Sequence, residues 1–408
     1  MEGDGKKTGG RDNDASAANR NLDGMPDAVI VTYGMSTEGY ELARRAALRG
    51  ATVFIVDESN PAAILLNADT ARRYADASAL KEEEPIMPIK PLHEAVAKAD
   101  YVFFAPRIRT QVHNTKTHAQ AHFKDAVEYV EEGSSVIFCV PVGFGENSDY
   151  AEILEHDTGL NVGTEVSYYY CPLESGAPPP RLIGSASADA EDERLALLLS
   201  PDPAAPAGFT TMYAAEHAHA LRMVTRFAGI CTMLEMSRFV PEDTRHEIAP
   251  DDPMRESYLD GMVGGLLDIH IIEISLENAK SLRRLAYLFG KAVSSYVLWL
   301  VENVKQVMRD AELRTTKTRV VILWTFDYNL LRGDHGEMSA LLVDRLRDWM
   351  AEVEMFEEPP RELLVTDRPV VIIPCSPKDF EKAEAIQRER PSLLIVKANA
   401  LCERFVSD

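Results

Sequence analysis

The sequence predicts an α/β protein: an N-terminal Rossmann-like domain with a parallel sheet, a central all-helical domain with a long connecting helix, and a smaller C-terminal α/β domain. Three observations lead to this prediction. Short apolar runs alternate with helical patterns over residues 27–211. Helical spacing then continues alone over residues 212–313, and the alternation returns over residues 314–408. Strands that alternate with helices indicate βαβ units and parallel pairing.

The elements of the first domain follow from their local patterns. Continuous apolar runs are typical of strands that helices cover on both faces. Such runs predict strands at residues 28–33, 51–57, 100–106, 134–143 and 164–172. Amphipathic segments between them predict helices at residues 38–50, 92–99 and 117–133. A Pro-rich loop is expected near residues 176–184.

The remaining elements are mostly helical before the strand pattern returns. Residues 212–239 carry apolar side chains at three- and four-residue spacing, which is typical of a helix. A helical pattern dominates residues 254–313, with one long helix expected after Glu273. In the last domain we expect strands at residues 318–326, 368–375 and 392–398 and helices at residues 338–353 and 376–389.

Composition limits the classes of partner. The formal net charge of -22 argues against binding to nucleic acid or to an anionic membrane, because both need basic patches. The most apolar helical stretch, residues 285–301, is interrupted by Lys291 and two serines, so we expect no membrane span. Five cysteines without a CxxC pair favour a reducing, cytoplasmic location. Residues 1–26 are polar, and we expect them to form a disordered leader.

The stretch between the first two predicted strands resembles a phosphate-binding turn. Gly34, Ser36 and Gly39 stand at the three glycine positions of G-x-G-x-x-G, where a tight turn, a close backbone approach and close helix packing are needed. Asp57 follows at the spacing from which a carboxylate reaches a ribose 2′-hydroxyl and disfavours a 2′-phosphate. This predicts NAD rather than NADP. The alternative is a βαβ unit that binds nothing. The expected cofactor-binding residues are Gly34, Ser36, Thr37, Gly39, Asp57 and Arg107.

The three-part order, with several local segments, resembles the UDP-glucose/GDP-mannose dehydrogenase family of NAD-dependent nucleotide-sugar oxidoreductases. The resemblance covers nearly the whole chain after residue 26. It implies a central helix that joins the outer domains and forms a dimer contact, and a C-terminal nucleotide-binding domain. The matching segments are "AVIVTYGMSTEGYELARRAALRGATVFIVD", "SVIFCVPVGFGE", "VSYYYCPLESGAPPPRLIG", "AAEHAHALRM", "VGGLL" and "VVILWTFDYNLLRGDHGEMSALLVDRL".

The chemistry of that family does not carry over with the fold. The family oxidises a sugar alcohol to an acid through a thiohemiacetal on a cysteine, which follows a Gly-Gly pair after one residue. Here Gly264 and Gly265 are followed by Leu266 and Leu267, and leucine is not a nucleophile. The resemblance therefore implies a divergent member without the catalytic cysteine. Other family positions differ as well: Ile271 replaces an aspartate, His219 a lysine, Met223 an asparagine, Cys139 a threonine and Asp327 a lysine, and Glu174 is one place displaced from the glutamate position at Leu173.

The candidate catalytic residues are His219, Cys139 and Glu174. His219 would act as an acid or base, or is a polar residue on a partly exposed helix face. Cys139 would be a nucleophile or soft metal ligand at a strand end, or is a small buried apolar residue. Its segments also resemble the iron hydrogenase of methanogens, in which a cysteine at this place binds the iron.

No metal site is otherwise expected. His118 and His122 share one helix face with His113 upstream, and we interpret them as solvated histidines, because a metal site needs three or four ligands.

Together these observations predict an NAD-binding oxidoreductase-like protein that lacks the four-electron chemistry and carries out at most a two-electron hydride transfer on an unknown substrate. The rival interpretation is a non-catalytic protein that binds a nucleotide or nucleotide sugar. A third is a metal or organometallic protein that uses Cys139. The expected partners are a small molecule and a second copy of the chain in a homodimer. Tyr296 and Trp299 of the long helix would suit the dimer interface, or pack in the core.

Overall fold

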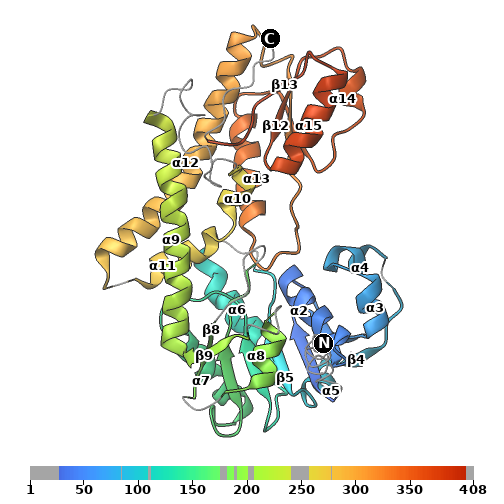
Figure 1. The fold of residues 1–408 in the computed structure, drawn as a ribbon, viewed down its shortest axis with the longest axis vertical. Helices are drawn as coiled ribbons and strands as arrows, with labels where there is room; N and C mark the ends of the chain where they lie inside the picture. The colour runs from blue at the N-terminus through green and yellow to red at the C-terminus, as the bar shows by residue number, and fades with distance from the viewer. Residues whose placement is uncertain are drawn as a thin grey trace, which may run out of the picture. The chain divides into compact units, whose positions relative to one another are not determined.

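The computed structural model describes residues 27–83, 85–108, 112–174, 182–187, 191–200, 206–239, 257–276 and 278–400. The expected leader at residues 1–26 lies outside them. The chain divides into two compact units. Unit 1 comprises Met1–Arg107, Lys116–Val140 and Asn147–Ala215, and unit 2 comprises Ile108–Thr115, Pro141–Glu146 and Glu216–Asp408. The predicted fold class is confirmed: unit 1 contains a Rossmann-like sheet, and unit 2 contains the long helices and a smaller α/β part (Figure 1).

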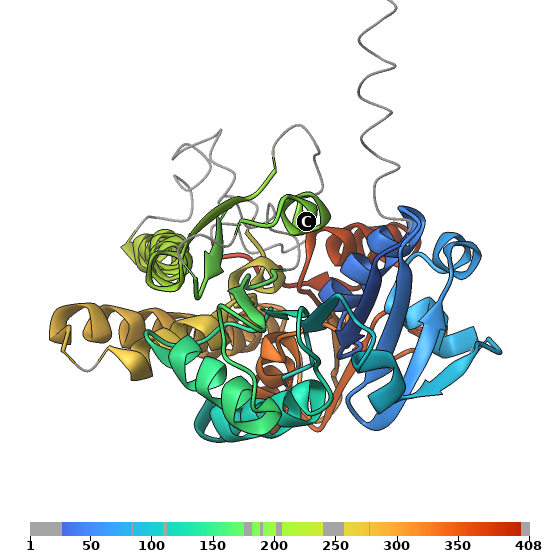
Figure 2. The ribbon, with the colours of Figure 1, turned by 90° about the horizontal axis from the view of Figure 1, so that it is seen from below.

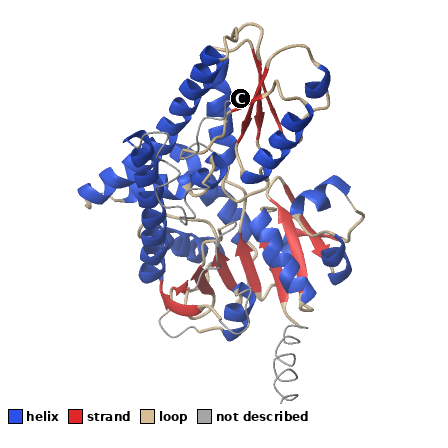
Figure 3. Ribbon diagram, turned by 45° about the horizontal axis from the view of Figure 1, so that its top comes forward, coloured by secondary structure: helices blue, strands red, loops and turns tan. Residues whose placement is uncertain are grey.

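The sheet of unit 1 has the strand order β4-β3-β2-β1-β5-β6-β7-β8-β9 (Figure 3). Its strands are β1 (Val29–Tyr33), β2 (Thr52–Asp57), β3 (Asn60–Leu66), β4 (Ile89–Pro91), β5 (Tyr101–Phe104), β6 (Ser135–Phe138), β7 (Ser167–Tyr170), β8 (Leu182–Ser185) and β9 (Gly208–Thr211). The five strands from β2 to β7 in this order are parallel. Their carboxyl ends therefore meet at one edge of the sheet, where open α/β sheets bind ligands.

The edge strands of this sheet differ from the prediction. We expected no strand between Asp57 and the helix at residues 92–99, yet β3 turns back antiparallel to β2, and β4 pairs antiparallel with β3. The short connection between β2 and β3 allows the hairpin, and β3 then pairs along almost the full length of β2. The blue part of the ribbon shows these strands side by side (Figure 2). The Rossmann core thus ends in a hairpin beside β2.

The helices of unit 1 follow the amphipathic pattern. They are α2 (Thr37–Leu48), α3 (Ala68–Arg73), α4 (Ala77–Glu83), α5 (Leu92–Val96), α6 (Val112–Val127), α7 (Glu146–Thr158) and α8 (Glu193–Leu199), with the first residues of α6 and of α7 belonging to unit 2. In α2 the buried side chains recur at helical spacing, with Tyr40, Ala43, Ala46 and Ala47 at most 1% exposed. Small residues on this face let α2 lie close to β1 and β2.

Four described helices precede the small sheet of unit 2, and the first residues of α9 belong to unit 1. They are α9 (Met212–Phe239), α10 (Leu259–Val263), α11 (Leu266–Ser275) and α12 (Lys280–Asp310). The helix predicted at residues 212–239 is confirmed with the same bounds, and α12 is the long helix expected after Glu273. Val293, Val297, Leu300 and Val304 are buried at three- and four-residue spacing, so one face of α12 forms the core of unit 2.

The small sheet of unit 2 has the order β11-β10-β12-β13, all parallel. Its strands are β10 (Arg319–Leu323), β11 (Glu352–Phe356), β12 (Val370–Pro374) and β13 (Leu394–Ile395), and its helices are α13 (Asp334–Arg347), α14 (Glu362–Val365) and α15 (Pro377–Glu389). The helix expected at residues 338–353 is wrong in its extent: it ends at Arg347, and Glu352 begins β11. Pairing with β10 decides the conformation of this segment despite its helix-forming residues.

All three tryptophans of the chain, Trp299, Trp324 and Trp349, belong to unit 2. Trp324 is fully buried, and its indole Nε1 donates to Asp260 Oδ1 at 2.8 Å. Tyr296 is 2% exposed and stacks on Trp299, so its ring packs in the core of unit 2. Among the described residues, no helix is long and apolar enough to cross a membrane.

Candidate functional site

The predicted phosphate-binding turn connects β1 to α2. Gly34 has a φ of 112°, and a Cβ atom there would lie 2.3 Å from the carbonyl oxygen of Ala105. Gly39 is also tightly packed, because a Cβ would come within 3.0 Å of the Ala105 Cβ. Only glycine fits at position 34, and position 39 leaves almost no room for a larger side chain. Both glycines therefore serve the close approach of β1, α2 and the end of β5.

Ser36, at the middle glycine position, is the N-cap of α2. Its Oγ accepts the N–H of Gly39 at 3.1 Å and donates to the carbonyl oxygen of Ala105 at 2.8 Å. Ser36 is fully buried. A serine N-cap satisfies one of the donors that a helix start leaves unpaired. The hydroxyl thus fixes the turn from within, and α2 begins directly afterwards at Thr37.

The acid predicted for the ribose lies at the end of β2. Asp57 accepts the N–H of Ser59 at 2.9 Å, and its carboxylate lies 3.2 Å from Arg107 NH2 and 3.8 Å from Lys81 Nζ. Burial acts to raise the pKa of Asp57, but the hydrogen bonds from Ser59 and the two cations outweigh it and hold the pKa below its usual range. Asp57 is therefore an ionised acceptor at the carboxyl edge of the sheet.

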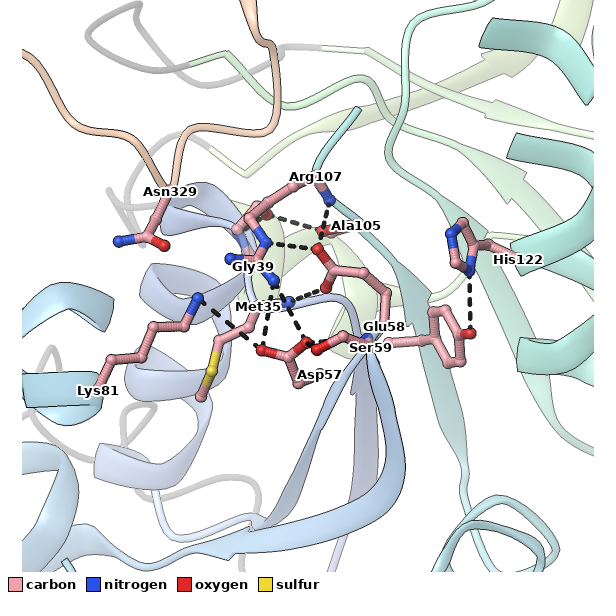
Figure 4. Close-up of polar contacts among 12 residues, drawn as sticks. Met35, Gly39, Asp57, Glu58, Ser59, Lys81, Ala105, Arg107, His122 and Asn329 are labelled. Carbon is pink, nitrogen blue, oxygen red and sulfur yellow. Dashed lines mark hydrogen bonds and ion pairs between the residues drawn. The ribbon is translucent and has the colours of Figure 1, made fainter. Parts of the chain in front are cut away.

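A second acid, Glu58, forms a hydrogen bond with the backbone of the turn. Glu58 Oε2 accepts the backbone N–H of Met35 at 3.0 Å, and Oε1 accepts the Nε–H of Arg107 (Figure 4). The side chains of Glu58 and Arg107 are 10% and 14% exposed. Arg107, which we expected to contact a ligand anion, thus holds both Asp57 and Glu58 in this structure. The sequence analysis missed Glu58, although it directly follows Asp57 at the same sheet edge.

Two of the three histidines of α6, His118 and His122, contact each other in unit 1. His118 Nε2 and His122 Nε2 are 3.3 Å apart, and the Tyr33 hydroxyl lies 3.4 Å from His122 Nδ1. Burial and the neighbouring His118 lower the pKa of His122. The side chain of His113 lies outside the described residues. The contacts show a hydrogen-bonded pair that reaches β1.

The cysteines of the sheet edge are buried. Cys139 follows β6 and Cys171 follows β7, and both are 0% exposed. Burial raises the pKa of the Cys139 thiol well above its ordinary value, which keeps it protonated at neutral pH. Its Sγ lies 3.7 Å from the carbonyl oxygen of Ile137. Glu174 is partly buried at the end of this described stretch. The catalytic roles of Cys139 and Glu174 stay predictions.

His219 belongs to a buried charged cluster in unit 2. His219 Nε2 lies 3.0 Å from Asp268 Oδ2, and Arg332 contacts both oxygens of Asp268 at 2.6 and 2.8 Å. Arg222 NH2 lies 3.2 Å from His219 Nδ1. Because arginine only donates, Nδ1 is the acceptor and Nε2 carries the proton toward Asp268. Both ring nitrogens thus have partners inside unit 2, and the acid–base role of His219 stays a prediction.

Asp268 is the centre of this cluster. Asp268 is 1% exposed, and it directly follows Leu267, the position at which the resemblance places the family's catalytic cysteine. Burial opposes its ionisation, but Arg332 and His219 more than compensate, so the pKa of Asp268 lies well below its usual range. Neither Asp268 nor Arg332 was selected from the sequence. The signal was weak, because Asp268 stands in an otherwise apolar helix.

The Gly-Gly loop is closed by another acid. Asp334 Oδ2 accepts the N–H of Gly265, and Oδ1 accepts the N–H of Leu267, each at 2.8 Å. Asp334 is 6% exposed. Burial, followed by repulsion from Asp268, raises the pKa of Asp334 to about 6, against the attraction of Arg332. The start of α11, where the family has its nucleophile, is thus held by an internal carboxylate.

A cavity of about 180 Å³ lies against this loop within unit 2. Its lining combines apolar side chains with ionisable groups: Ile108, Leu266, Leu267, His270, Ser294, Gly333, Asp334, Glu337, Met338 and Leu341. Leu266 and Leu267 are 5% and 7% exposed. The Gly-Gly loop therefore presents aliphatic side chains to this cavity.

Comparison with known proteins identifies the fold. No protein-family model and no curated protein sequence matches the chain. Solved structures do match over nearly the full length of both chains. UDP-D-ManNAc dehydrogenase from Pyrococcus horikoshii superimposes with a TM-score of 0.66 at 16% identity, covering 92% of this chain and 96% of that one.

Two further structures agree with this result. UDP-N-acetyl-mannosamine dehydrogenase from Staphylococcus aureus has a TM-score of 0.61 at 13% identity and covers 93% of this chain and 96% of its own. UDP-glucose dehydrogenase from Pyrobaculum islandicum has a TM-score of 0.56 at 16% identity, with 92% and 91% covered. This protein therefore has the fold of the nucleotide-sugar dehydrogenases, as the sequence resemblance implied.

Proposed function

We propose that the protein binds NAD at the Gly34–Gly39 turn of unit 1 and is an oxidoreductase-like relative of the nucleotide-sugar dehydrogenases. The conformation of Gly34 is the observation that carries the proposal. Its φ of 112°, and the 2.3 Å that would separate a Cβ at this position from the Ala105 carbonyl oxygen, fit the tight turn that leads from a parallel strand into a phosphate-binding helix start. The N-terminus of α2, a helix of 12 residues, then faces the carboxyl edge of the sheet.

The residues of unit 1 fit a dinucleotide in this way. The backbone of the turn and the start of α2 would hold the diphosphate. Asp57 would accept a ribose hydroxyl, and its negative charge disfavours the 2′-phosphate of NADP. Arg107 would contact a phosphate once it is released from Glu58. A bound nicotinamide would supply a hydride acceptor or donor for one two-electron step.

The four-electron chemistry is the part that we propose to be lost. A thiohemiacetal needs a thiol, and the corresponding loop carries Leu266 and Leu267. The N–H groups of Gly265 and Leu267 are bound to Asp334. These contacts favour a second candidate function: a protein that binds a nucleotide or nucleotide sugar without turning it over.

We also propose a homodimer that forms through α12. Leu285, Tyr287 and Leu288 on this helix are 46%, 51% and 52% exposed. Apolar and aromatic side chains gathered in one exposed segment are typical of interfaces. The molar mass from light scattering tests it: we expect twice the chain mass of 45.3 kDa, and the chain mass itself for Leu285→Lys combined with Leu288→Lys.

Calorimetry with NAD, NADP and several nucleotide sugars tests the proposed function. We expect NAD to bind and NADP to bind more weakly, and Asp57→Asn to narrow the difference. Turnover is then followed by the absorbance of reduced nicotinamide for each nucleotide sugar. Reduction of NAD identifies an enzyme, whereas binding without reduction identifies the non-catalytic function. If no dinucleotide binds, the proposal is wrong.

A further inference from the structure

The donors of the phosphate-binding turn have unequal partners. The N–H of Gly34 donates to the backbone carbonyl of Val56 at 2.8 Å, and that of Gly39 donates to Ser36 Oγ. These two bonds belong to the architecture of the turn. The N–H of Met35 instead donates to Glu58, an ionisable side chain that can rotate away. Among these three donors, Met35 is therefore the one that a ligand can take over.

Glu58 imitates the charge of a phosphate at this donor. One carboxylate oxygen accepts from Met35, and the other accepts the Nε–H of Arg107 and lies 3.4 Å from its backbone nitrogen. Backbone N–H groups and a guanidinium are the groups that bind phosphates in proteins. The same two groups are occupied here by an acid of the chain itself (Figure 4).

A diphosphate and Glu58 exclude each other at this place. Both are anions, and the single hydrogen of the Met35 amide forms one strong bond. Two unpaired anions at hydrogen-bonding distance from one donor repel each other strongly in a site of low exposure. Binding of a dinucleotide must therefore release Glu58 from Met35.

We propose that Glu58 is an internal competitor of the dinucleotide diphosphate and sets the affinity of the turn. This inference rests on the proposed function and adds the residue that controls it. The diphosphate replaces the Glu58 carboxylate on the Met35 N–H and on Arg107, while Asp57 keeps its position beside Arg107. A ligand without a diphosphate leaves the Glu58 contacts in place.

The test compares Glu58→Gln with Glu82→Gln in the full-length protein. Both variants remove one negative charge from unit 1, but Glu82 is exposed on α4 and Glu58 is bound to Met35. Calorimetry with NAD, ADP-ribose and adenosine measures the dissociation constants. We expect Glu58→Gln to bind NAD and ADP-ribose about tenfold more tightly, because a neutral amide competes less well for the donor. Adenosine affinity should be unchanged, and Glu82→Gln should resemble the wild type.

Glu58→Ala provides a second variant, and circular dichroism verifies that each protein is folded. Tighter NAD binding by both Glu58 variants than by the wild type supports the inference. NAD binding by both variants when the wild type shows none also supports it. Equal or weaker binding than that of a wild type that does bind NAD overturns the inference and leaves the proposed function intact. If no variant binds NAD or ADP-ribose, both are overturned.

Discussion

The two glycine turns of this protein are closed by carboxylates in different ways. In unit 1, Glu58 accepts one hydrogen bond from the backbone of the turn, at Met35, and a longer one of 3.4 Å from the backbone N–H of Arg107, and it shares the Arg107 side chain with Asp57. In unit 2, Asp334 makes two backbone hydrogen bonds, to Gly265 and Leu267, across a distance of nearly 70 residues in sequence. Asp334 is thus a structural clamp on its loop, whereas Glu58 makes a single hydrogen bond within the Gly34–Gly39 turn, to Met35.

The contacts of these two carboxylates indicate which of the two turns can bind a ligand. Release of Asp334 would leave two buried N–H groups and a carboxylate without partners, a cost of several kcal/mol. Release of Glu58 leaves the backbone N–H groups of Met35 and Arg107, and the incoming diphosphate can accept hydrogen bonds from both. The turn of unit 1 is therefore the adaptable one, and the loop of unit 2 is locked.

The largest expected effect is a loss of stability on removal of the buried charge of Asp268 in unit 2. Asp268→Asn removes the charge that pairs with Arg332 and His219 in the interior, and we expect a loss of about 3–5 kcal/mol in the free energy of unfolding. Urea denaturation measures it. Asp348→Asn, at an exposed position whose side chain lies 3.7 Å from Arg345, is the control and should cost at most about 0.5 kcal/mol. A loss below about 1 kcal/mol for Asp268→Asn would contradict the structural role of the cluster.

The next prediction addresses the rigidity of the turn in unit 1. Gly34→Ala combines an unfavourable φ with a collision against Ala105, and we expect a loss of about 2–4 kcal/mol and no measurable dinucleotide binding. Gly133→Ala is the matched control, since Gly133 has a φ of 90° but no atom within 4 Å of a Cβ. It should cost about 1 kcal/mol. Equal losses for the two variants would show that close packing at Gly34 is unimportant.

The pH dependence of the free energy of unfolding tests the burial of Asp334. The pKa of Asp334 is raised from 3.8 to about 6 in the folded protein. The folded state therefore binds the proton more tightly than the unfolded state. This contribution is fully present below about pH 4 and is lost as the pH rises to about 6, by an amount on the order of 3 kcal/mol. The difference in unfolding free energy between the wild type and Asp334→Asn should follow this window. A difference that does not change with pH would refute it.

The smallest expected effect concerns the serine in the turn. Ser36→Ala removes the N-cap of α2 and the bond to Ala105, at a cost of about 1 kcal/mol, whereas Ser36→Gly should cost only about 0.3 kcal/mol, because glycine is tolerated at an N-cap. Thermal unfolding measures both. If Ser36→Gly cost as much as Ser36→Ala, the contribution of Ser36 would come from its two hydroxyl hydrogen bonds and not from the backbone preference of an N-cap.

The sequence predicted the parts of the molecule that local patterns determine. The bounds of α9, the long helix α12 and the place of Gly34, Gly39 and Asp57 at one sheet edge all follow from periodicity and from glycine chemistry. The resemblance to nucleotide-sugar dehydrogenases correctly predicted the fold. It also predicts that Leu267 occupies the position of the nucleophile.

Other parts could not be predicted, because partners distant in sequence determine them. Glu352 begins a strand because β10 lies beside it, although its neighbours favour a helix. The roles of Asp268 and Asp334 depend on tertiary contacts with Arg332 and with the Gly-Gly loop. Glu58 looks like an ordinary surface acid until the fold brings Met35 and Arg107 to it.

The distribution of tryptophan determines what optical experiments can detect. Indole emission originates entirely from unit 2, and Trp324, buried against Asp260, dominates the change expected when that core opens. Unit 1 contains no tryptophan and contributes no indole emission. A fluorescence melting curve therefore monitors only half of the molecule, and comparing it with a calorimetric scan reveals whether the two units melt together or one after the other.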